Sequence, residues 1–218
     1  MNLNLEHRLK FFSPVYIAII ILWLFHISGI LGISVGFKDW FANKTPLNLL
    51  IMFVALIVFF PLDSIKKWGL FLCFGVLGIL AEYLGVTFGL FFGEYAYGNN
   101  FGPKIYGVPL LIGVNWALLT FICGAIANKM SDNVFLKSLL GTFMMLFLDL
   151  FMEKVAPIFD FWAFSGGYAP VDNYIAWGII SFIFHLVFHL FKTQGKFQIS
   201  LHLYLVQLVF FSYFYVYL

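Results

Sequence analysis

Seven apolar stretches, each long enough or nearly long enough to cross a lipid bilayer, constrain this chain more than any other feature. Their approximate ranges are 14–34, 46–62, 68–91, 107–128, 134–156, 173–191 and 198–217. About 20 consecutive apolar residues span the hydrocarbon core as a helix, and a helix bonds all of its own backbone groups there. We therefore expect an all-α, polytopic membrane bundle of about seven helices. The second stretch is short enough to be tilted or interfacial.

The composition supports an integral membrane protein. Hydrophobic residues make up 63% of the chain, charged residues only 10%, and the mean hydropathy is +0.99. Soluble domains carry about a quarter charged residues. The net charge of +2 is too small to favour a nucleic-acid partner. Both cysteines fall within apolar stretches, without a disulfide framework or metal-ligand spacing, and no connection resembles a linker, so residues 1–218 are expected to form a single domain.

The Lys and Arg residues in the connections predict the orientation. Eight lie in the N-terminal segment and after the second, fourth and sixth stretches: Arg8, Lys10, Lys66, Lys67, Lys129, Lys137, Lys192 and Lys196. Four lie on the opposite side: Lys38, Lys44, Lys104 and Lys154. Since cytoplasmic connections carry the excess of positive residues, we expect the N-terminus inside and the C-terminus outside. We also expect the membrane to be the cytoplasmic membrane of a bacterium or archaeon.

The third stretch carries a glycine stripe with an acid in its middle. Its members are Gly75, Gly78, Glu82, Gly85 and Gly89, at steps of three and four residues. On a helix this spacing places them along one face, where glycines allow another backbone to approach closely. A carboxylate within a membrane helix is costly and is commonly functional, which makes Glu82 a candidate site residue.

The fifth stretch supplies two more acids. Asp149 and Glu153 are four residues apart and therefore share a helix face. Counted from the outer ends of their stretches, Asp149 and Glu82 lie at similar depths. Buried carboxylic acids of this kind either hydrogen-bond neighbouring helices or act as an acid and a base, and the residues alone leave both possibilities open.

Two outer loops and the helix starts beside them are dense in aromatic and polar groups. The first loop contains Glu94, Tyr95 and Tyr97, and leads to Asn115 and Trp116. The second contains Trp162 and leads to residues 173–177, which include Asn173 and Trp177. Aromatic rings at this level form an interfacial belt in many membrane proteins, but aromatic faces also stabilise cations.

The sixth stretch carries His185 and His189, which form an H-x-x-x-H pair. Membrane di-iron hydroxylases need about eight histidines in several such motifs, whereas this chain has five. A site for one metal ion remains an alternative, but helix–helix hydrogen bonding is favoured, and we expect no metal. His26, in the first stretch, stands alone among apolar neighbours.

The motifs resemble the membrane-integral carotenoid biosynthesis proteins of the CruF type over residues 68–190. The first part is Glu82-x-x-Gly85-x-x-x-Gly89, Phe92-Gly93-x-Tyr95-x-Tyr97, Gly102-Pro103, Gly107-Val108-Pro109 and Asn115-Trp116. The second part is Asp149-x-x-x-Glu153-x-x-Ala156-Pro157, Phe161-Trp162 and Ala169-Pro170-x-x-Asn173-Tyr174-x-x-Trp177. The sequence departs from the pattern at Lys154, where an apolar residue or proline is expected.

The resemblance implies a cofactor-independent carotenoid 1,2-hydratase, which adds water to the terminal C1–C2 double bond of an acyclic or monocyclic carotenoid. It implies catalytic roles for Glu82, Asp149, Glu153 and Glu94. A group of polar and aromatic residues would surround the substrate cation: Tyr95, Tyr97, Asn115, Trp116, Trp162, Asn173 and Trp177. The expected partners are the carotenoid and membrane lipid. The alternatives are an end-group cyclase, a non-catalytic carotenoid- or lipid-binding protein, and a small transporter.

Overall fold

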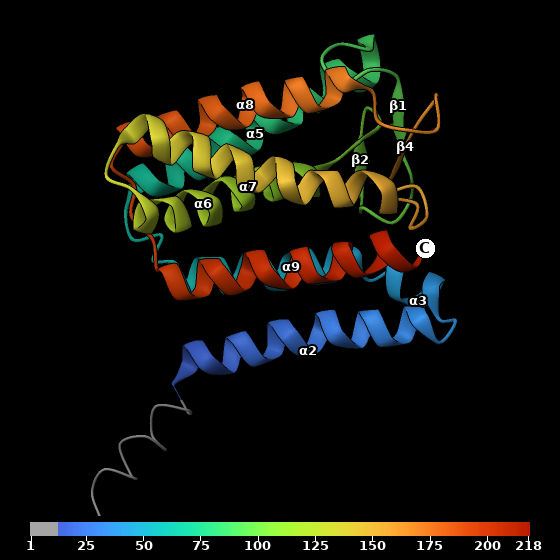
Figure 1. The fold of residues 1–218 in the computed structure, drawn as a ribbon, viewed down its shortest axis with the longest axis horizontal. Coiled ribbons are helices and arrows are strands. Elements are labelled where there is room, and N and C mark those ends of the chain that lie inside the picture. Colours follow the sequence, from blue (N-terminus) through green and yellow to red (C-terminus); the bar gives the residue numbers. More distant parts are fainter. Residues whose placement is uncertain (1–12) are drawn as a thin grey trace, which may run out of the picture.

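The computed structural model describes residues 13–218, which form a bundle of long antiparallel helices with small strands at one end (Figure 1). The helices are α2 (Pro14–Ser34), α3 (Lys38–Ala42), α4 (Thr45–Phe59), α5 (Ile65–Phe88), α6 (Leu110–Met130), α7 (Val134–Val155), α8 (Val171–Leu190) and α9 (Phe197–Tyr217). The strands are β1 (Tyr95–Tyr97), β2 (Lys104–Ile105), β3 (Val108–Pro109) and β4 (Trp162–Phe164). The predicted membrane helical bundle is confirmed.

Six helices of the described chain are long and apolar enough to cross a membrane, namely α2 and α5 to α9. The second predicted segment, α4, is an apolar helix of 15 residues, or about 22 Å. It nevertheless runs from one end of the bundle to the other. At the start of α4, Pro46 lies beside Gly102, which belongs to the loops at the strand end of the bundle. Just after the last residue of α4, Phe60 packs against Gly195, which belongs to the connection between α8 and α9 at the opposite end. Successive predicted segments therefore still cross the bundle in opposite directions, as the predicted orientation requires.

Local sequence signals explain where several helices begin and end. Pro14 opens α2, where a missing backbone N–H costs nothing. The Ser64 side chain accepts a hydrogen bond from Lys67 N at the start of α5, and the Asn133 side chain accepts one from Leu136 N at the start of α7.

The central helix is α6, which is buried over most of its length between α4, α5, α7, α8 and α9. The outermost helix, α2, packs mainly on α9 (Figure 1). The glycine stripe of α5 was predicted to let another backbone approach closely, and at Gly75 and Gly78 that backbone is α6. A Cβ atom added to Gly113 of α6 would lie 2.6 Å from Gly75 O, and one added to Gly78 would lie 2.7 Å from the Trp116 ring. These glycines bring the two helices into close contact.

Two small antiparallel ladders join the loops at the end of the bundle. In the first, β1 pairs with β4, with Tyr95 opposite Phe164 and Tyr97 opposite Trp162. In the second, β2 pairs with β3. The sequence did not predict these strands, because two or three residues in aromatic loops carry no readable alternation. The first ladder ties together two loops that are far apart in the chain.

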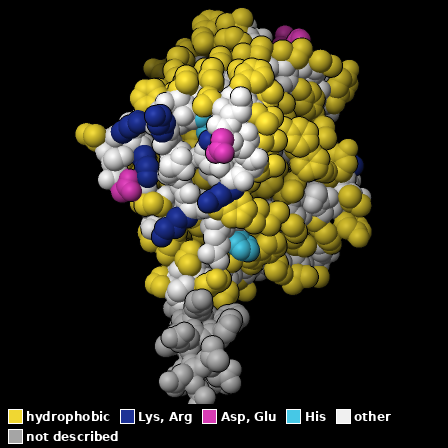
Figure 2. All heavy atoms as spheres, turned by 60° about the vertical axis from the view of Figure 1, so that its left-hand side comes forward, with side chains coloured by type: hydrophobic (Ala, Val, Ile, Leu, Met, Phe, Trp, Pro, Cys, Tyr) yellow, Lys and Arg dark blue, Asp and Glu magenta, His cyan; other side chains and the backbone are white. Residues whose placement is uncertain are grey.

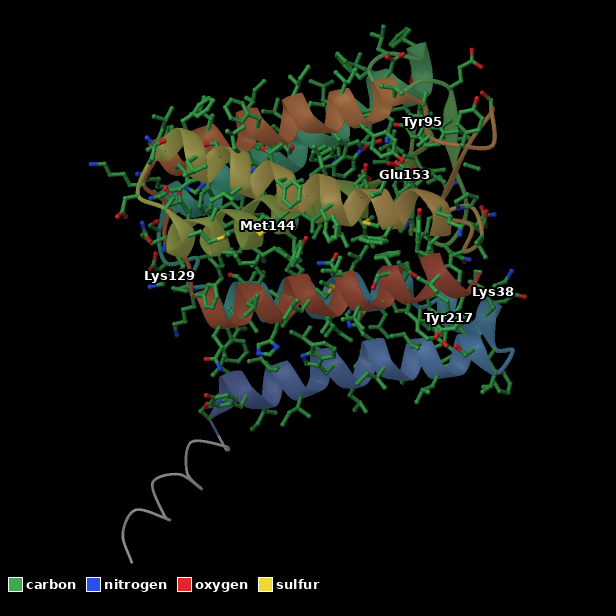
Figure 3. All side chains as sticks on the ribbon, viewed as in Figure 1. Lys38, Tyr95, Lys129, Met144, Glu153 and Tyr217 are labelled. Carbon is green, nitrogen blue, oxygen red and sulfur yellow. The ribbon has the colours of Figure 1, made fainter. Side chains whose placement is uncertain are left out.

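Lysine side chains gather at the end of the bundle opposite the strands. Figure 2 shows this cluster at one end, while apolar side chains cover the sides of the molecule. Lys129 lies at this end in Figure 3, and Lys66 Nζ there donates a hydrogen bond to Phe191 O. Arg8 and Lys10, which contributed to the predicted orientation, lie outside the described residues.

Candidate active site

Glu82 is the most fully bonded carboxylate of the site. It lies on α5 with 3% of its surface exposed. Tyr95 and Tyr97 donate hydrogen bonds from their hydroxyls to Oε2 at 2.5 and 2.7 Å, and Trp116 Nε1 donates to Oε1 at 2.9 Å. Three donors thus compensate the cost of burying this polar group. Four residues that the sequence singled out come together here.

The β1–β4 ladder holds the two tyrosines over Glu82. Tyr95 and Tyr97 are two residues apart in β1, so their side chains point to the same face of the strand. Gly85 leaves space for them, because a Cβ atom there would lie 2.9 Å from the Tyr95 hydroxyl and 2.8 Å from the Phe92 ring. A glycine one turn after Glu82 is therefore required for the loop to close on α5.

Glu153, near the end of α7, has a similar shell. Trp162 Nε1 donates to its Oε2 at 2.9 Å, and Asn173 Nδ2 donates to its Oε1 at 2.8 Å. Lys154, the departure from the family pattern, points away: its Nζ donates to Tyr215 O at 2.8 Å and lies 4.7 Å from the centre of that ring. The lysine therefore does not occupy the space around Glu153.

Glu82 and Glu153 line one small cavity under the loops, and Figure 3 shows Tyr95 and Glu153 close together there. Its volume is about 10 Å³, room for roughly one water molecule. The other lining residues are Phe92, Tyr95, Tyr97, Ile112, Trp162, Phe164, Asn173 and Trp177. Trp177 stacks on Trp116 with ring centres 3.9 Å apart, which extends the aromatic wall toward Glu82.

Asp149 lies one helical turn below Glu153 on α7. Its depth matches that of Glu82, since each acid lies six residues before the last residue of its helix, or about 9 Å. Asp149 is 1% exposed, and neither carboxyl oxygen has a hydrogen-bond partner among the described residues. It is close enough to Glu153 and Glu82 for their charges to act on it. An unpartnered carboxyl group is much cheaper to bury protonated than charged.

Two predicted residues lie away from this cavity. Glu94 is exposed at the tip of the first loop, where its backbone and side-chain oxygens accept hydrogen bonds from Ser165 Oγ. Asn115 is buried on α6 and lines a different cavity, together with Asn48 and Gln207. The structure therefore groups Glu82, Asp149 and Glu153, without Glu94.

The tyrosines of the ladder retain their protons over a wide range of pH. Burial, together with the adjacent Glu82, raises the pKa of Tyr95 and that of Tyr97 well above the ordinary value for a phenol. Both hydroxyls therefore act as donors to Glu82 at neutral and alkaline pH.

The histidine pair lies farther along α8. His185 Nδ1 donates to Ser181 O at 2.8 Å, and its ring packs on Gly141 of α7. His185 Nε2 and both His189 ring nitrogens have no partner among the described residues. The two rings are 6.3 Å apart, and within residues 13–218 no three His, Cys, Asp or Glu side chains lie together as potential metal ligands.

Three wall residues of the cavity were not singled out from the sequence as site residues: Phe92, Ile112 and Phe164. Phe92 belongs to a quoted motif, but nothing in the motif distinguishes a wall residue from a lipid-facing ring. Phe164 reaches the site through its pairing with Tyr95, which only the ladder reveals.

Comparison with known families gives one match. A family model described as "Carotenoid biosynthesis protein" matches residues 44–218, which covers the chain from the start of α4 through α9. All the residues of the cavity lie within the match. Comparisons with curated proteins and with solved structures found no match.

Proposed function

Because the chain belongs to the carotenoid biosynthesis protein family, we propose that it is a hydratase that adds water to the terminal C1–C2 double bond of an acyclic or monocyclic carotenoid. One observation carries this proposal. Two buried carboxylates and several aromatic rings surround a space for about one water molecule, with an unpartnered carboxyl group one turn below. These are the parts that proton addition and water capture require.

Asp149 is the proposed acid. It is the buried carboxyl group of the cluster that lacks hydrogen-bond donors, so nothing offsets the cost of charging it in place. In the proposed first step, its proton moves to C2 of the substrate. The electron pair of the C1–C2 double bond forms the new C–H bond, and a tertiary cation remains at C1.

The aromatic wall and Glu82 would stabilise that cation. Trp162, Trp177 and Tyr95 are among the aromatic side chains that line the cavity, and aromatic faces attract positive charge. Glu82 contributes a negative charge held in place by three donors. A fixed charge of this kind acts on the transition state without reorganising.

Glu153 is the proposed base. A water molecule in the cavity attacks C1, forming the C–O bond, and gives one proton to Glu153. Glu153 and Asp149 are four residues apart on α7, so they are neighbours on one helix face. Passing the proton from Glu153 back to Asp149 restores the starting state, and the cycle consumes only water.

A carotenoid can approach the cavity from the side. A groove of about 350 Å³ lies between the end of α5 and α8, lined by Gly89, Phe91, Gly93, Asp172, Ile175, Ala176 and Ile179. Its residues flank Phe92 and Trp177, which line the cavity, so movement of Phe92 would open the way. A carotenoid is about as long as the hydrocarbon core is thick, ~30 Å, so its end group fits a site near one face of the membrane.

Oxygen-18 water provides the decisive experiment. Membranes containing the protein receive an acyclic carotenoid in labelled water, and the products are analysed by mass spectrometry. We expect a product one water heavier that carries the label in a tertiary alcohol. A ring-bearing product of unchanged mass would refute the hydratase in favour of a cyclase, and an unmodified but bound carotenoid would indicate a binding protein.

We propose that the end with the strands faces outward and that the N-terminus is cytoplasmic, in keeping with the lysine distribution. Cysteine introduced at Asn99 or Gly166 should then react with a membrane-impermeant thiol reagent outside intact cells. Cysteine at Asn133 or Gln194 should react only after permeabilisation. The reverse pattern would overturn the orientation.

A further inference from the structure

A second, larger cavity system lies next to the small cavity, among α2, α3, α4, α6 and α9. A groove of about 310 Å³ opens between α2, α3, α4 and α9, and Phe25, Trp40 and Leu47 on its lining are exposed at the side of the molecule. Its wall is mainly aromatic and aliphatic. The groove shares five lining residues with an inner cavity of about 50 Å³: His26, Thr45, Asn48, Phe161 and Phe210. The two spaces therefore adjoin.

Several polar side chains line the inner cavity, where burying a polar group without a hydrogen bond costs free energy. Asn115, on α6, is 2% exposed and its Nδ2 has no hydrogen-bond partner. Asn48, on α4, also lines the cavity, and its Oδ1 is buried without a partner. A buried donor or acceptor without a partner costs about 1–3 kcal/mol, so a group that donates to Asn48 Oδ1 and accepts from Asn115 Nδ2 would remove that cost.

His26 fixes the orientation of the Asn48 amide. His26 Nδ1 lies 2.8 Å from Leu22 O, a carbonyl that can only accept, so Nδ1 carries the proton. His26 Nε2 is then an acceptor, and Asn48 Nδ2 donates to it at 3.2 Å. Asn48 Oδ1 is therefore left as an unpaired acceptor and Asn115 Nδ2 as an unpaired donor, on two side chains that line the cavity.

We infer that this system binds a long apolar molecule that ends in a hydroxyl group. A hydroxyl can donate to Asn48 Oδ1 and accept from Asn115 Nδ2, whereas a hydrocarbon end satisfies neither atom. A carboxylate would place an acceptor against Asn48 Oδ1. The apolar groove accommodates the chain, and its exposed rim gives access from the lipid.

This site is separate from the proposed active site, although it adjoins it. Asn115 directly precedes Trp116, and Met152, which lines the inner cavity, directly precedes Glu153. The proposed product, a carotenoid that ends in a tertiary alcohol, is itself a long apolar molecule with a terminal hydroxyl group. Binding is nevertheless measured without turnover, so its outcome is independent of the hydratase proposal.

Photo-crosslinking tests the inference. The purified full chain in lipid nanodiscs is irradiated with hexadecanol carrying a diazirine at mid-chain, and labelled peptides are mapped by mass spectrometry. The matched probes are the same chain as the methyl ether, the alkane and the carboxylic acid. We expect the alcohol to label α2, α4 and α9 beside the groove more strongly than any matched probe.

Two variants remove the two unpartnered atoms separately. Asn115→Leu and Asn48→Leu should each weaken labelling by the alcohol roughly two- to tenfold, the effect of one hydrogen bond, and leave alkane labelling unchanged. Thr45→Val is the control, because Thr45 lines both spaces but its hydroxyl already donates to Ala42 O at 2.8 Å. Elution as a single species and unchanged tryptophan fluorescence establish that each variant folds.

The inference is overturned if the alcohol, ether, alkane and acid label the groove equally. It is likewise overturned if Asn115→Leu and Asn48→Leu both label like the wild type, since the cavity would then hold only water.

Discussion

Glu82 and Asp149 lie at the same depth in neighbouring parts of the bundle, but their surroundings are opposite. Glu82 accepts three hydrogen bonds, two of them from the loop ladder, whereas Asp149 accepts none from the described residues. A carboxyl group held by three donors is oriented and can carry charge in place. One without donors is stable in an apolar setting only while it keeps its proton.

The contrast extends to the regions around them. The cluster beneath the loops satisfies both Glu82 and Glu153 with indole, phenol and amide donors. The contact between α7 and α8 below it contains Thr142 Oγ1 and His185 Nε2 as well as Asp149, all without partners in the described chain. Polar groups held by donors thus surround the small cavity, and the unpaired ones lie along the contact between α7 and α8. In the proposed mechanism, the first region would stabilise charge and the second would donate the proton.

Asp149→Asn should have the largest effect. Asparagine keeps the size of the side chain but cannot donate a carboxylic proton, so product formation should fall by up to about 10⁴-fold. The measurement is the amount of hydrated carotenoid, by chromatography, per amount of membrane-inserted protein.

Asp132→Asn is the matched control for this change, because Asp132 is an exposed acid in the connection between α6 and α7 and lines neither the cavity nor the groove. It should retain wild-type activity. If Asp149→Asn formed as much hydrated carotenoid as the wild type, Asp149 would have only a structural role. The proposed functional contrast between the two acids would then be wrong.

Glu82→Gln should have a smaller effect on activity, accompanied by a loss of stability. It removes the negative charge near the cation, for which we expect roughly a 10²-fold loss of activity. Its new amide N–H₂ cannot accept from the donors that surround Glu82, which should cost about 1–3 kcal/mol in the free energy of unfolding. Thermal unfolding followed by tryptophan fluorescence reports the second effect.

Tyr106→Phe, at an exposed phenol in the same loop region, is the control for loop changes and should leave both quantities unchanged. If Glu82→Gln kept full activity and stability, the hydrogen bonds to Glu82 would not hold the loops.

The sequence predicted the bundle and part of the site for identifiable reasons. Apolar length sets the helices, and the three- and four-residue spacing of the α5 glycines predicted a face that another backbone can approach, where Gly75 and Gly78 meet α6. The similar depths of Glu82 and Asp149 followed from counting residues to the helix ends. These features depend on local sequence alone.

The rest depends on contacts that no local pattern encodes. The donors to Glu82 and Glu153 come from loops joined by a three-residue ladder, so the sequence could not distinguish a bonded acid from an unbonded one. The side of α6 on which Asn115 lies was equally hidden, because a helix that is apolar all round shows no preferred face. Asn115 was consequently expected beside Glu82 and lines the cavity near Asn48 and Gln207 instead.

His185→Leu should change activity by less than about tenfold, which separates the histidines from the acids. His185 bonds its own helix and packs on Gly141, and it does not line the cavity of Glu82 and Glu153. Leucine fills a similar volume, so the packing should persist. Loss of activity in this variant, together with inactivation of the wild type by a metal chelator, would instead establish the histidine pair as a metal site.

Thr142→Val should have the smallest effect, and it tests whether the contact between α7 and α8 is dry. Thr142 Oγ1 is buried and unpartnered, so replacing the hydroxyl with a methyl group removes no hydrogen bond and should change the free energy of unfolding by less than about 1 kcal/mol. Thr120→Val is the matched control: its hydroxyl donates to Trp116 O at 2.8 Å, and its loss should cost about 0.5–1.5 kcal/mol. Both are measured by thermal unfolding in the same detergent. If Thr142→Val proved the more costly, or reduced activity as Asp149→Asn does, then bound water would connect the hydroxyl to Asp149. Asp149 would then belong to a hydrated proton path. The two acids would differ in that water molecules donate hydrogen bonds to Asp149, whereas protein side chains donate them to Glu82.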